Sequence, residues 1–260
     1  MTDSPVLELR RVSKSFGAVQ ALYEVDFHVA PGEVMALVGD NGAGKSTLIK
    51  CIAGIHPIDA GEIVFDGEPV TIHSPRDAAQ LGIEVVYQDL ALADNLDVVQ
   101  NMYLGREIHD FIGRLKEAPM EKRTAETLRG LRVTTIGSIR QQVASLSGGQ
   151  RQSVAIGRAV MWNSRVVILD EPTAALGVAQ TEQVLELVRR LAEQGLAVVL
   201  ISHNLNDVFE VATRITVLRL GRNVAVYDRA STTQQEVVEA ITAGMPTVGG
   251  ASSGDGEPPE

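Results

Sequence analysis

The sequence predicts a mixed α/β fold with an α/β core, an antiparallel β-subdomain at the N-terminus and an α-helical subdomain inserted into the core. A glycine-rich loop at 39–47 stands between an apolar run expected to be a strand and a segment expected to be a helix. The apolar runs at 166–169 and 197–201 are typical of strands buried on both faces of a parallel sheet. Residues 21–29 alternate apolar and polar side chains, which indicates a half-exposed antiparallel strand.

Composition sets limits on the function. With 45% hydrophobic and 22% charged residues in 260, the chain is an ordinary globular protein. The net charge of −10 argues against a nucleic-acid-binding surface and against electrostatic attachment to anionic lipid. A single cysteine, Cys51, excludes an intramolecular disulfide and is expected in the core. Residues 1–5 lack the features of a signal peptide, and no apolar run approaches the roughly 18 residues of a membrane span. We therefore expect a cytoplasmic protein.

Periodicity and turn residues set the order of the elements. Residues 95–162 look mostly helical and belong to an inserted helical subdomain of about 90–162. Residues 1–245 are expected to form a single domain, and the segment 246–260 is expected to be disordered because it cannot build a core. Strands are expected at 6–10, 21–29, 33–38, 61–67, 83–87, 166–169, 197–201, 214–220 and 224–228, and helices at 47–53, from Ser74-Pro75 onward, at 178–194 and at 233–243.

The glycine-rich loop matches G-x-x-x-x-G-K-[ST], the phosphate-binding P-loop, and predicts a P-loop NTPase core. Its glycines let several backbone N–H groups point at phosphate, and the following helix adds its positive N-terminus. Lys45 can reach the β- and γ-phosphates, and Ser46 can ligate Mg²⁺. The flanking strand and helix argue against a chance glycine-rich turn. The predicted nucleotide-binding residues are Gly39, Asp40, Asn41, Gly42, Ala43, Gly44, Lys45, Ser46 and Thr47.

Polar residues follow the predicted core strands. Asp170 and Glu171 come directly after 166–169, where the first could hold Mg²⁺ through water and the second could polarise a water. His203 follows 197–201 and faces the same crevice as the P-loop, within reach of the γ-phosphate. Gln88 ends another strand and could reach a metal or the attacking water. A solvated turn for the acids and a structural role for the histidine are the alternatives.

Two further segments bear on nucleotide binding. Phe16 lies 29 residues before Lys45 and could stack on adenine or be a partly buried core aromatic. The segment Leu146-Ser147-Gly148-Gly149-Gln150 precedes an expected helix, with Ser147 as a natural N-cap. Exposed backbone donors there would make a second phosphate-binding site. A helix cap with a flexible lead-in explains the same residues.

Together these motifs resemble the ATP-binding cassette (ABC) ATPases over about residues 6–245, because Leu146 to Gln150 matches that family's signature motif. The resemblance implies ATP and Mg²⁺ as ligands and a head-to-tail dimer. In that dimer, ATP sits between one subunit's P-loop and the signature residues Ser147, Gly148, Gly149 and Gln150 of the other.

The resemblance also implies roles for single residues. Phe16 would stack on adenine, and Gln88 would sense Mg²⁺ and contact the transmembrane partner. Asp170 would be the Walker B acid, Glu171 the catalytic base and His203 the switch histidine. Catalysis is thus assigned to Glu171, His203, Lys45 and Gln88, and the metal to Ser46, Gln88 and Asp170.

Residues 82–92 and 101–107 resemble the ATP-binding subunits of bacterial monosaccharide importers, of the ribose, xylose and fructose kind. This resemblance implies ATP hydrolysis coupled to import, at the inner face of the cell membrane. The implied partners are integral-membrane permease subunits, a second copy or a homologous ATPase, and indirectly a sugar-binding protein. A soluble cassette ATPase acting on the ribosome or DNA and an exporter subunit are the alternatives. No tandem cassette, coiled-coil insertion or basic face supports the first.

One residue departs from the family pattern. Where the family usually has an aspartate after Ser-Ala-Leu, this chain has Gly177. Because that acid normally contacts the opposite subunit, the departure concerns the coupling of the two ATP sites and leaves ATP binding itself unaffected.

Overall fold

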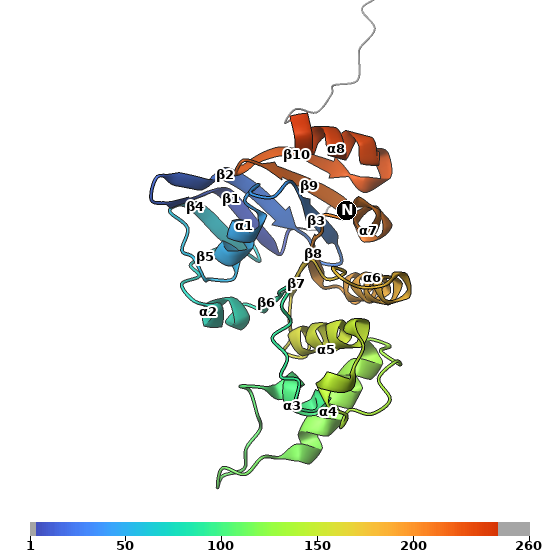
Figure 1. Ribbon diagram of the computed structural model, residues 1–260. Helices are drawn as coiled ribbons and strands as arrows, with labels where there is room; N and C mark the ends of the chain where they lie inside the picture. Colours follow the sequence, from blue (N-terminus) through green and yellow to red (C-terminus); the bar gives the residue numbers. More distant parts are fainter. Residues whose placement is uncertain (1–3, 244–260) are drawn as a thin grey trace, which may run out of the picture.

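The computed structural model describes residues 4–243, so the interpretation of 246–260 lies outside the described residues. Two sheets and their helices form one end of the molecule, and helices α3, α4 and α5 form the other (Figure 1). This arrangement confirms the predicted α/β core, N-terminal β-subdomain and inserted helical region. Within 4–243, no helix is long and apolar enough to cross a membrane.

The core sheet has six strands in the order β10-β9-β3-β8-β7-β6. All neighbours pair in parallel except β9 and β10, which form the predicted hairpin. The carboxyl ends of β3, β7 and β8 therefore meet at one edge of the sheet. The strands are β3 (Val34–Val38), β6 (Ile83–Val86), β7 (Val166–Asp170), β8 (Ala197–Ile201), β9 (Arg214–Arg219) and β10 (Arg222–Asp228).

Strand β7 shows why these runs are apolar throughout. Ile168 packs into the cluster between the two sheets, whereas Val167 and Leu169 pack on the opposite face against helices α5 and α6. Neither face of the strand reaches water, so each position favours an apolar side chain.

The second sheet is antiparallel, in the order β2-β1-β4-β5, and comprises β1 (Leu7–Phe16), β2 (Val19–Val29), β4 (Ala60–Phe65) and β5 (Glu68–Val70). Strands β1 and β2 are longer than the alternation predicts. The register shifts between Leu9 and Val12, and Arg11 and Glu24 have positive φ angles. Such bulges add a residue to one strand, which breaks the period of two that reveals a strand in a sequence.

Helices cover the core sheet. The helix α6 buries its predicted stripe of Val184, Leu187, Val188 and Leu191, and Ser74 caps α2 by accepting a hydrogen bond from the Asp77 backbone. The short helix α7 was not predicted. The elements are α1 (Lys45–Ile52), α2 (Pro75–Gln80), α6 (Val178–Glu193), α7 (Leu205–Val211), η2 (Arg229–Ser231) and α8 (Gln234–Ala243).

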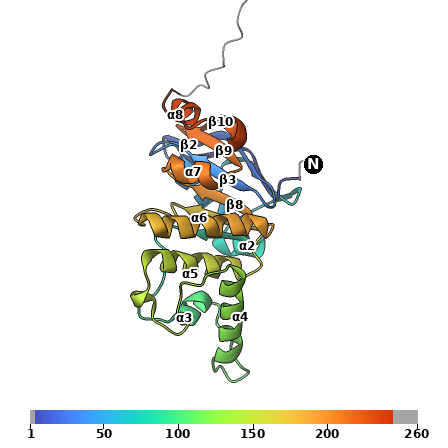
Figure 2. The same cartoon turned by 90° about the vertical axis from the view of Figure 1, so that its right-hand side faces the viewer.

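The helical subdomain has its own core around Met102, Tyr103 and Val154. Arg140 ties its helices together through ion pairs with Asp97, the N-cap of α3, and with two acids of α4. Helix α5 lies against α6 and joins the subdomain to the core (Figure 2). The elements are α3 (Val98–Tyr103), α4 (Glu117–Gly130), η1 (Val143–Ser145) and α5 (Gly148–Val160).

Candidate active site

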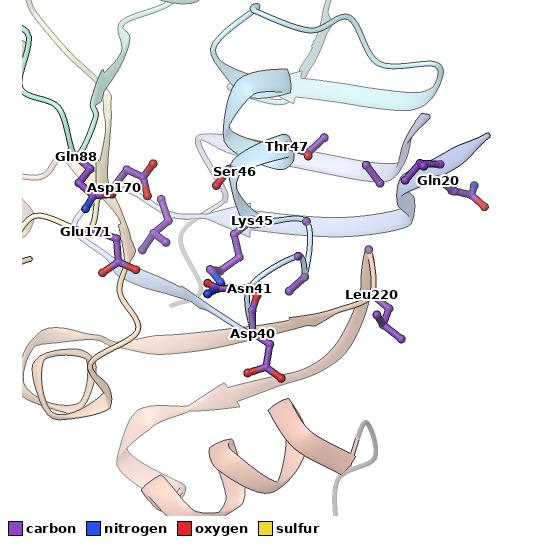
Figure 3. A pocket seen from close by; sticks show the side chains of 17 residues that line it. Gln20, Asp40, Asn41, Lys45, Ser46, Thr47, Gln88, Asp170, Glu171 and Leu220 are labelled. Carbon is purple, nitrogen blue, oxygen red and sulfur yellow. Dashed lines mark hydrogen bonds between the residues drawn. The ribbon is translucent and has the colours of Figure 1, made fainter. Parts of the chain in front are cut away.

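A cavity of about 540 Å³ opens at the carboxyl edge of the core sheet, within the size range of small-molecule sites. Figure 3 shows Lys45 and Ser46 in its middle, with Gln88, Asp170 and Glu171 on one side and Gln20 and Leu220 on the other. Its lining residues are Val19, Gln20, Ala21, Asp40, Asn41, Gly42, Ala43, Gly44, Lys45, Ser46, Thr47, Gln88, Asp170, Glu171, Ile201, Leu220 and Gly221.

The P-loop follows β3 and runs directly into α1, as the motif requires. Gly44 has φ +104°, and a Cβ at this position would lie 2.8 Å from the Ala21 carbonyl oxygen, so only glycine fits. Lys45 Nζ donates to the carbonyl oxygens of Gly39, at 2.5 Å, and Asp40, at 3.0 Å. Burial lowers the pKa of Lys45. The two hydrogen bonds hold the ammonium group at the loop. Phosphate oxygens of a bound nucleotide could replace these neutral carbonyl oxygens as its partners.

Glu171 leaves β7 in a left-handed backbone conformation, with φ +52°. A hydrogen bond from its N–H to the Ile201 carbonyl oxygen, at 2.9 Å, holds this turn against the neighbouring strand. The carboxylate Oε2 lies 2.7 Å from His203 Nδ1. Backbone strain in a non-glycine residue persists where the surroundings enforce it, and it is common at active sites. The structure therefore brings Glu171 and His203 together, with Glu171 in the lining of this cavity and both residues in the lining of a neighbouring one.

Asp170 lies beside Glu171 without a cationic partner in hydrogen-bond reach among the described residues. Burial, and next the charge of Glu171, raise its pKa, although Lys45 opposes the shift. A bound cation would relieve this unfavourable burial. Ser46, Gln88 and Asp170 all line the cavity with oxygen atoms, which are the ligands that Mg²⁺ prefers. The donor set thus fits Mg²⁺.

We expect Asp170→Asn to stabilise the nucleotide-free protein while impairing ATP hydrolysis. A raised carboxyl pKa in the folded state destabilises the fold at neutral pH, so removing the charge should raise the unfolding midpoint by roughly 2–4 °C, as about 1 kcal/mol does in a domain of this size. The gain should vanish as the pH falls through the raised pKa, where aspartate is itself protonated. Thermal unfolding without nucleotide, across pH, measures this effect.

The matched control is Asp66→Asn, because Asp66 is half-exposed and ion-paired with Arg165 at 2.8 Å. This variant should show no gain in the midpoint. An unchanged or lower midpoint for Asp170→Asn would show that its carboxylate is well partnered without a metal.

Gly39 and His203 line a neighbouring cavity, which shares Gln88 and Glu171 with this one, and Phe16 lies apart from both linings. Among residues 4–243, the cavity lining does not include it. The residue is 43% exposed, and its ring contacts the ring of His56 edge-on, with centroids 5.0 Å apart. Stacking of adenine on Phe16 stays a prediction.

The signature residues also lie outside the described cavity lining, because they belong to the helical subdomain. Ser147 is the N-cap of α5: its hydroxyl accepts from the Gln150 N–H, and the Gln150 side chain accepts from the Ser147 N–H at 2.8 Å. Ser147 and Gly148 are exposed, whereas Gly149 packs against Gln180. Ser147 therefore caps α5, as the sequence indicates. The capped end of the helix is nevertheless exposed at Ser147 and Gly148.

The sequence motifs did not predict the residues at one end of the cavity. Val19, Gln20 and Ala21 of β2 and Leu220 and Gly221 of the β9–β10 turn complete it. These residues carry no local signal, because their proximity depends on the pairing of distant segments.

Comparisons with known proteins agree with this geometry. The family described as ABC transporter matches residues 22–174. The fructose import ATP-binding protein FrcA of Rhizobium meliloti is 48% identical over 248 residues, covering 93% of this chain and 95% of that protein. The xylose/arabinose import ATP-binding protein XylG of Sulfolobus acidocaldarius is 47% identical, covering 92% and 95%.

Solved structures give the same result. The ADP conformation of MJ1267, an ATP-binding cassette of an ABC transporter, matches with a TM-score of 0.78 and 26% identity, covering 92% of this chain and 95% of that one. A dimeric structure of the bacterial ABC transporter cassette MJ0796 matches with a TM-score of 0.72 and 25% identity, covering 86% and 98%. A P-loop ATPase with the ATP-binding cassette fold is the class that these findings define. The chain belongs to the ABC transporter family.

Proposed function

We propose that this chain is the ATP-hydrolysing subunit of a membrane importer for a monosaccharide, acting at the inner face of the membrane through a separate permease. The relatives named for fructose and for xylose/arabinose import, which match over nearly their whole length, support the substrate class. The cavity lined by Lys45, Asp170 and Glu171 supports ATP hydrolysis. These named activities also favour import over export and over action on the ribosome or DNA.

In this proposal Lys45 and the loop amides hold the phosphates of ATP. Mg²⁺, held by Ser46, Gln88 and Asp170, would neutralise charge on the transferred phosphoryl group. Glu171 orients a water and accepts its proton as the water oxygen bonds to the γ-phosphorus, while the bond to the bridging oxygen breaks and ADP leaves. His203, 2.7 Å from the Glu171 carboxylate, would fix its orientation and, in this proposal, contacts the γ-phosphate.

The observation that carries the proposal is the separation between the P-loop and the signature segment, which is predicted to bind phosphate. The P-loop lies at the sheet edge, whereas Ser147 and Gly148 are exposed on the helical subdomain. A second copy, arranged head-to-tail, would place its Ser147–Gln150 segment over the first copy's cavity and complete the site. The dimeric cassette MJ0796 supports this assembly.

A groove between the core and the helical subdomain suits the permease. Arg106 pairs with Glu84 at 2.9 Å, and its guanidinium lies 5.3 Å from the centre of the Trp162 ring. Arg158, also in this groove, donates to the carbonyl oxygens of Leu90, at 2.8 Å, and Ala91. A permease segment in the groove would therefore contact Arg158, which is hydrogen-bonded to Leu90 and Ala91. Because these two residues closely follow Gln88 in the chain, docking of the permease would be linked to the active site.

Cysteine crosslinking tests this docking surface. We expect cysteines placed between Asp89 and Arg106, such as Leu104→Cys, to trap the permease in the intact transporter. Cys51 is the chain's only cysteine and is buried, so it contributes no background. Val178→Cys, at a fully exposed position on α6, is the matched control. Crosslinks at Val178 but none at 89–106 would place the permease elsewhere.

Uptake of labelled fructose, xylose and ribose tests the importer itself. Cells that carry Glu171→Gln as their sole copy should lose accumulation of one of these sugars, because closure without hydrolysis stops the cycle. Unimpaired accumulation of every monosaccharide tested, with ATPase activity present in the wild type, would refute sugar import while leaving the ATPase assignment.

A further inference from the structure

The connection between α3 and α4 exposes apolar side chains at its tip. This connection, residues 105–116, is called the α3–α4 hairpin below, and it extends from the end of the molecule that the helical subdomain forms (Figure 1, Figure 2). Phe111 is 98% exposed, and the adjacent Ile112 is 56% exposed. Neither belongs to a core cluster of residues 4–243. Exposed apolar side chains that lie together, rather than singly, mark interaction sites.

Hydrogen bonds fix the shape of this tip. The Asp110 N–H donates to the Arg114 carbonyl oxygen at 2.8 Å, and the Gly113 N–H donates to the Asp110 carbonyl oxygen at 3.1 Å. The Asp110 carboxylate accepts from the N–H groups of Ile112, at 3.0 Å, and Arg114, at 2.9 Å. Phe111 and Ile112 therefore stand at the end of a closed turn. Because the turn is already ordered, little conformational entropy is lost when the tip binds a partner.

Two cationic side chains follow the tip. Arg114 is exposed and pairs with Asp110 through Nε, at 3.2 Å. Lys116 is exposed, and its ammonium group has no partner among the described residues. The acid that follows, Glu117, is paired with Arg140. The tip thus combines apolar side chains with cations, a composition that suits the interface of an anionic membrane.

We propose that the tip of the α3–α4 hairpin contacts the lipid surface of the membrane, with Phe111 and Ile112 among the headgroups and Arg114 and Lys116 against anionic phosphates. The inference rests on the proposed function, which brings the chain to the inner face of a membrane. The hairpin begins beside Arg106, which lines the groove proposed for the permease. Docking of an integral-membrane protein in that groove would therefore hold the tip near the bilayer.

The net charge of −10 opposes attachment by a broad surface but not this local contact. At about 0.1 M salt, exposed charges more than about 10 Å apart are largely screened. The tip lies at the opposite end of the molecule from the core sheet, so the cations beside it decide the interaction (Figure 1). Two apolar side chains bury less surface than a myristoyl chain, which alone binds membranes weakly and reversibly. The permease would supply the second attachment.

A tryptophan at the tip reports whether it enters the lipid. The full-length Phe111→Trp variant is mixed with vesicles of phosphatidylcholine and phosphatidylglycerol, with and without brominated acyl chains. The wild type, whose single tryptophan is Trp162, gives the background emission. We expect the added emission to shift to shorter wavelength and to be quenched by the brominated lipid. Val178→Trp, at an apolar position that is 90% exposed on α6, is the matched control and should show neither change.

Sedimentation with the same vesicles measures the affinity. Phe111→Ser should lower the partition coefficient about tenfold, the order expected for one apolar side chain. Lys116→Gln should lower it about fivefold, and this difference should disappear at high salt. Both variants should hydrolyse ATP like the wild type, because neither position belongs to the described cavity lining.

Three results would overturn the membrane contact: wild type that stays in the supernatant, equal sedimentation of Phe111→Ser, or unquenched Phe111→Trp on the vesicles. An emission shift that needs the detergent-solubilised permease and no lipid would also overturn it, because the tip would then be a second permease contact. Absence of ATP hydrolysis in the wild type would instead refute the proposed function, and the vesicle result does not depend on that activity.

Discussion

Replacing Glu171 with glutamine should lower ATP hydrolysis by about 10²–10⁴-fold, the loss expected when a general base is removed. The amide keeps the shape of the side chain and its contact with His203, but it cannot accept the proton of the attacking water. ATP binding should persist, because Lys45, Ser46 and the loop amides are unchanged. Steady-state phosphate release, measured beside nucleotide affinity, separates the two effects.

The same variant should convert ATP into a stable link between two copies. With hydrolysis blocked, ATP stays between one P-loop and the partner's signature segment, so Glu171→Gln with ATP should elute as a dimer in size-exclusion chromatography. Wild type with ADP should elute as a monomer. Adding Ser147→Arg should abolish the dimer, because a bulky cation at the exposed cap would block the second phosphate site.

Gly177 bears directly on this experiment. It is the N-cap of α6, and no atom lies within 4 Å of the place where a Cβ would stand. By the family resemblance an acid here would contact the opposite subunit, so we expect the isolated chain to close less firmly, and the measurement belongs both on the isolated chain and with the permease present. Hydrolysis by Glu171→Gln at the wild-type rate in both settings would show that Glu171 is not the base.

Lys45→Ala should reduce turnover to background, a loss of at least about 10²–10³-fold for a group that stabilises the transferred phosphoryl. Among residues 4–243, the half-buried Lys45 ammonium donates only to the Gly39 and Asp40 carbonyl oxygens, so the fold should survive its removal. ATP hydrolysis and thermal unfolding together measure the change.

Lys122→Ala is the control, because Lys122 is exposed on α4, far from the cavity lining. It should hydrolyse ATP like the wild type. Wild-type turnover in Lys45→Ala would remove the P-loop assignment, whereas a large fall in its unfolding midpoint would mean that the lysine holds the loop together.

The sequence by itself determined the phosphate end of this site. The P-loop binds phosphate with successive backbone N–H groups and the start of one helix, so all of its phosphate-binding groups lie in one continuous segment of the chain. Asp170, Glu171 and His203 could likewise be placed from sequence, since parallel strands buried on both faces are apolar runs whose carboxyl ends share an edge. The cavity lining of Lys45, Asp170 and Glu171 agrees with that reasoning.

Only the tertiary structure decided the rest. The β2 residues and the β9–β10 turn meet because Tyr23 donates to the Gly221 carbonyl oxygen across about two hundred residues, and no local pattern encodes such a contact. Bulges hid the true length of β1 and β2, since an extra residue cancels the alternation. The separation of Ser147 from the P-loop depends on how α5 packs against α6. That packing depends on the size and shape of the side chains at the contact between the two helices. A motif, by contrast, specifies only the local backbone of its own segment.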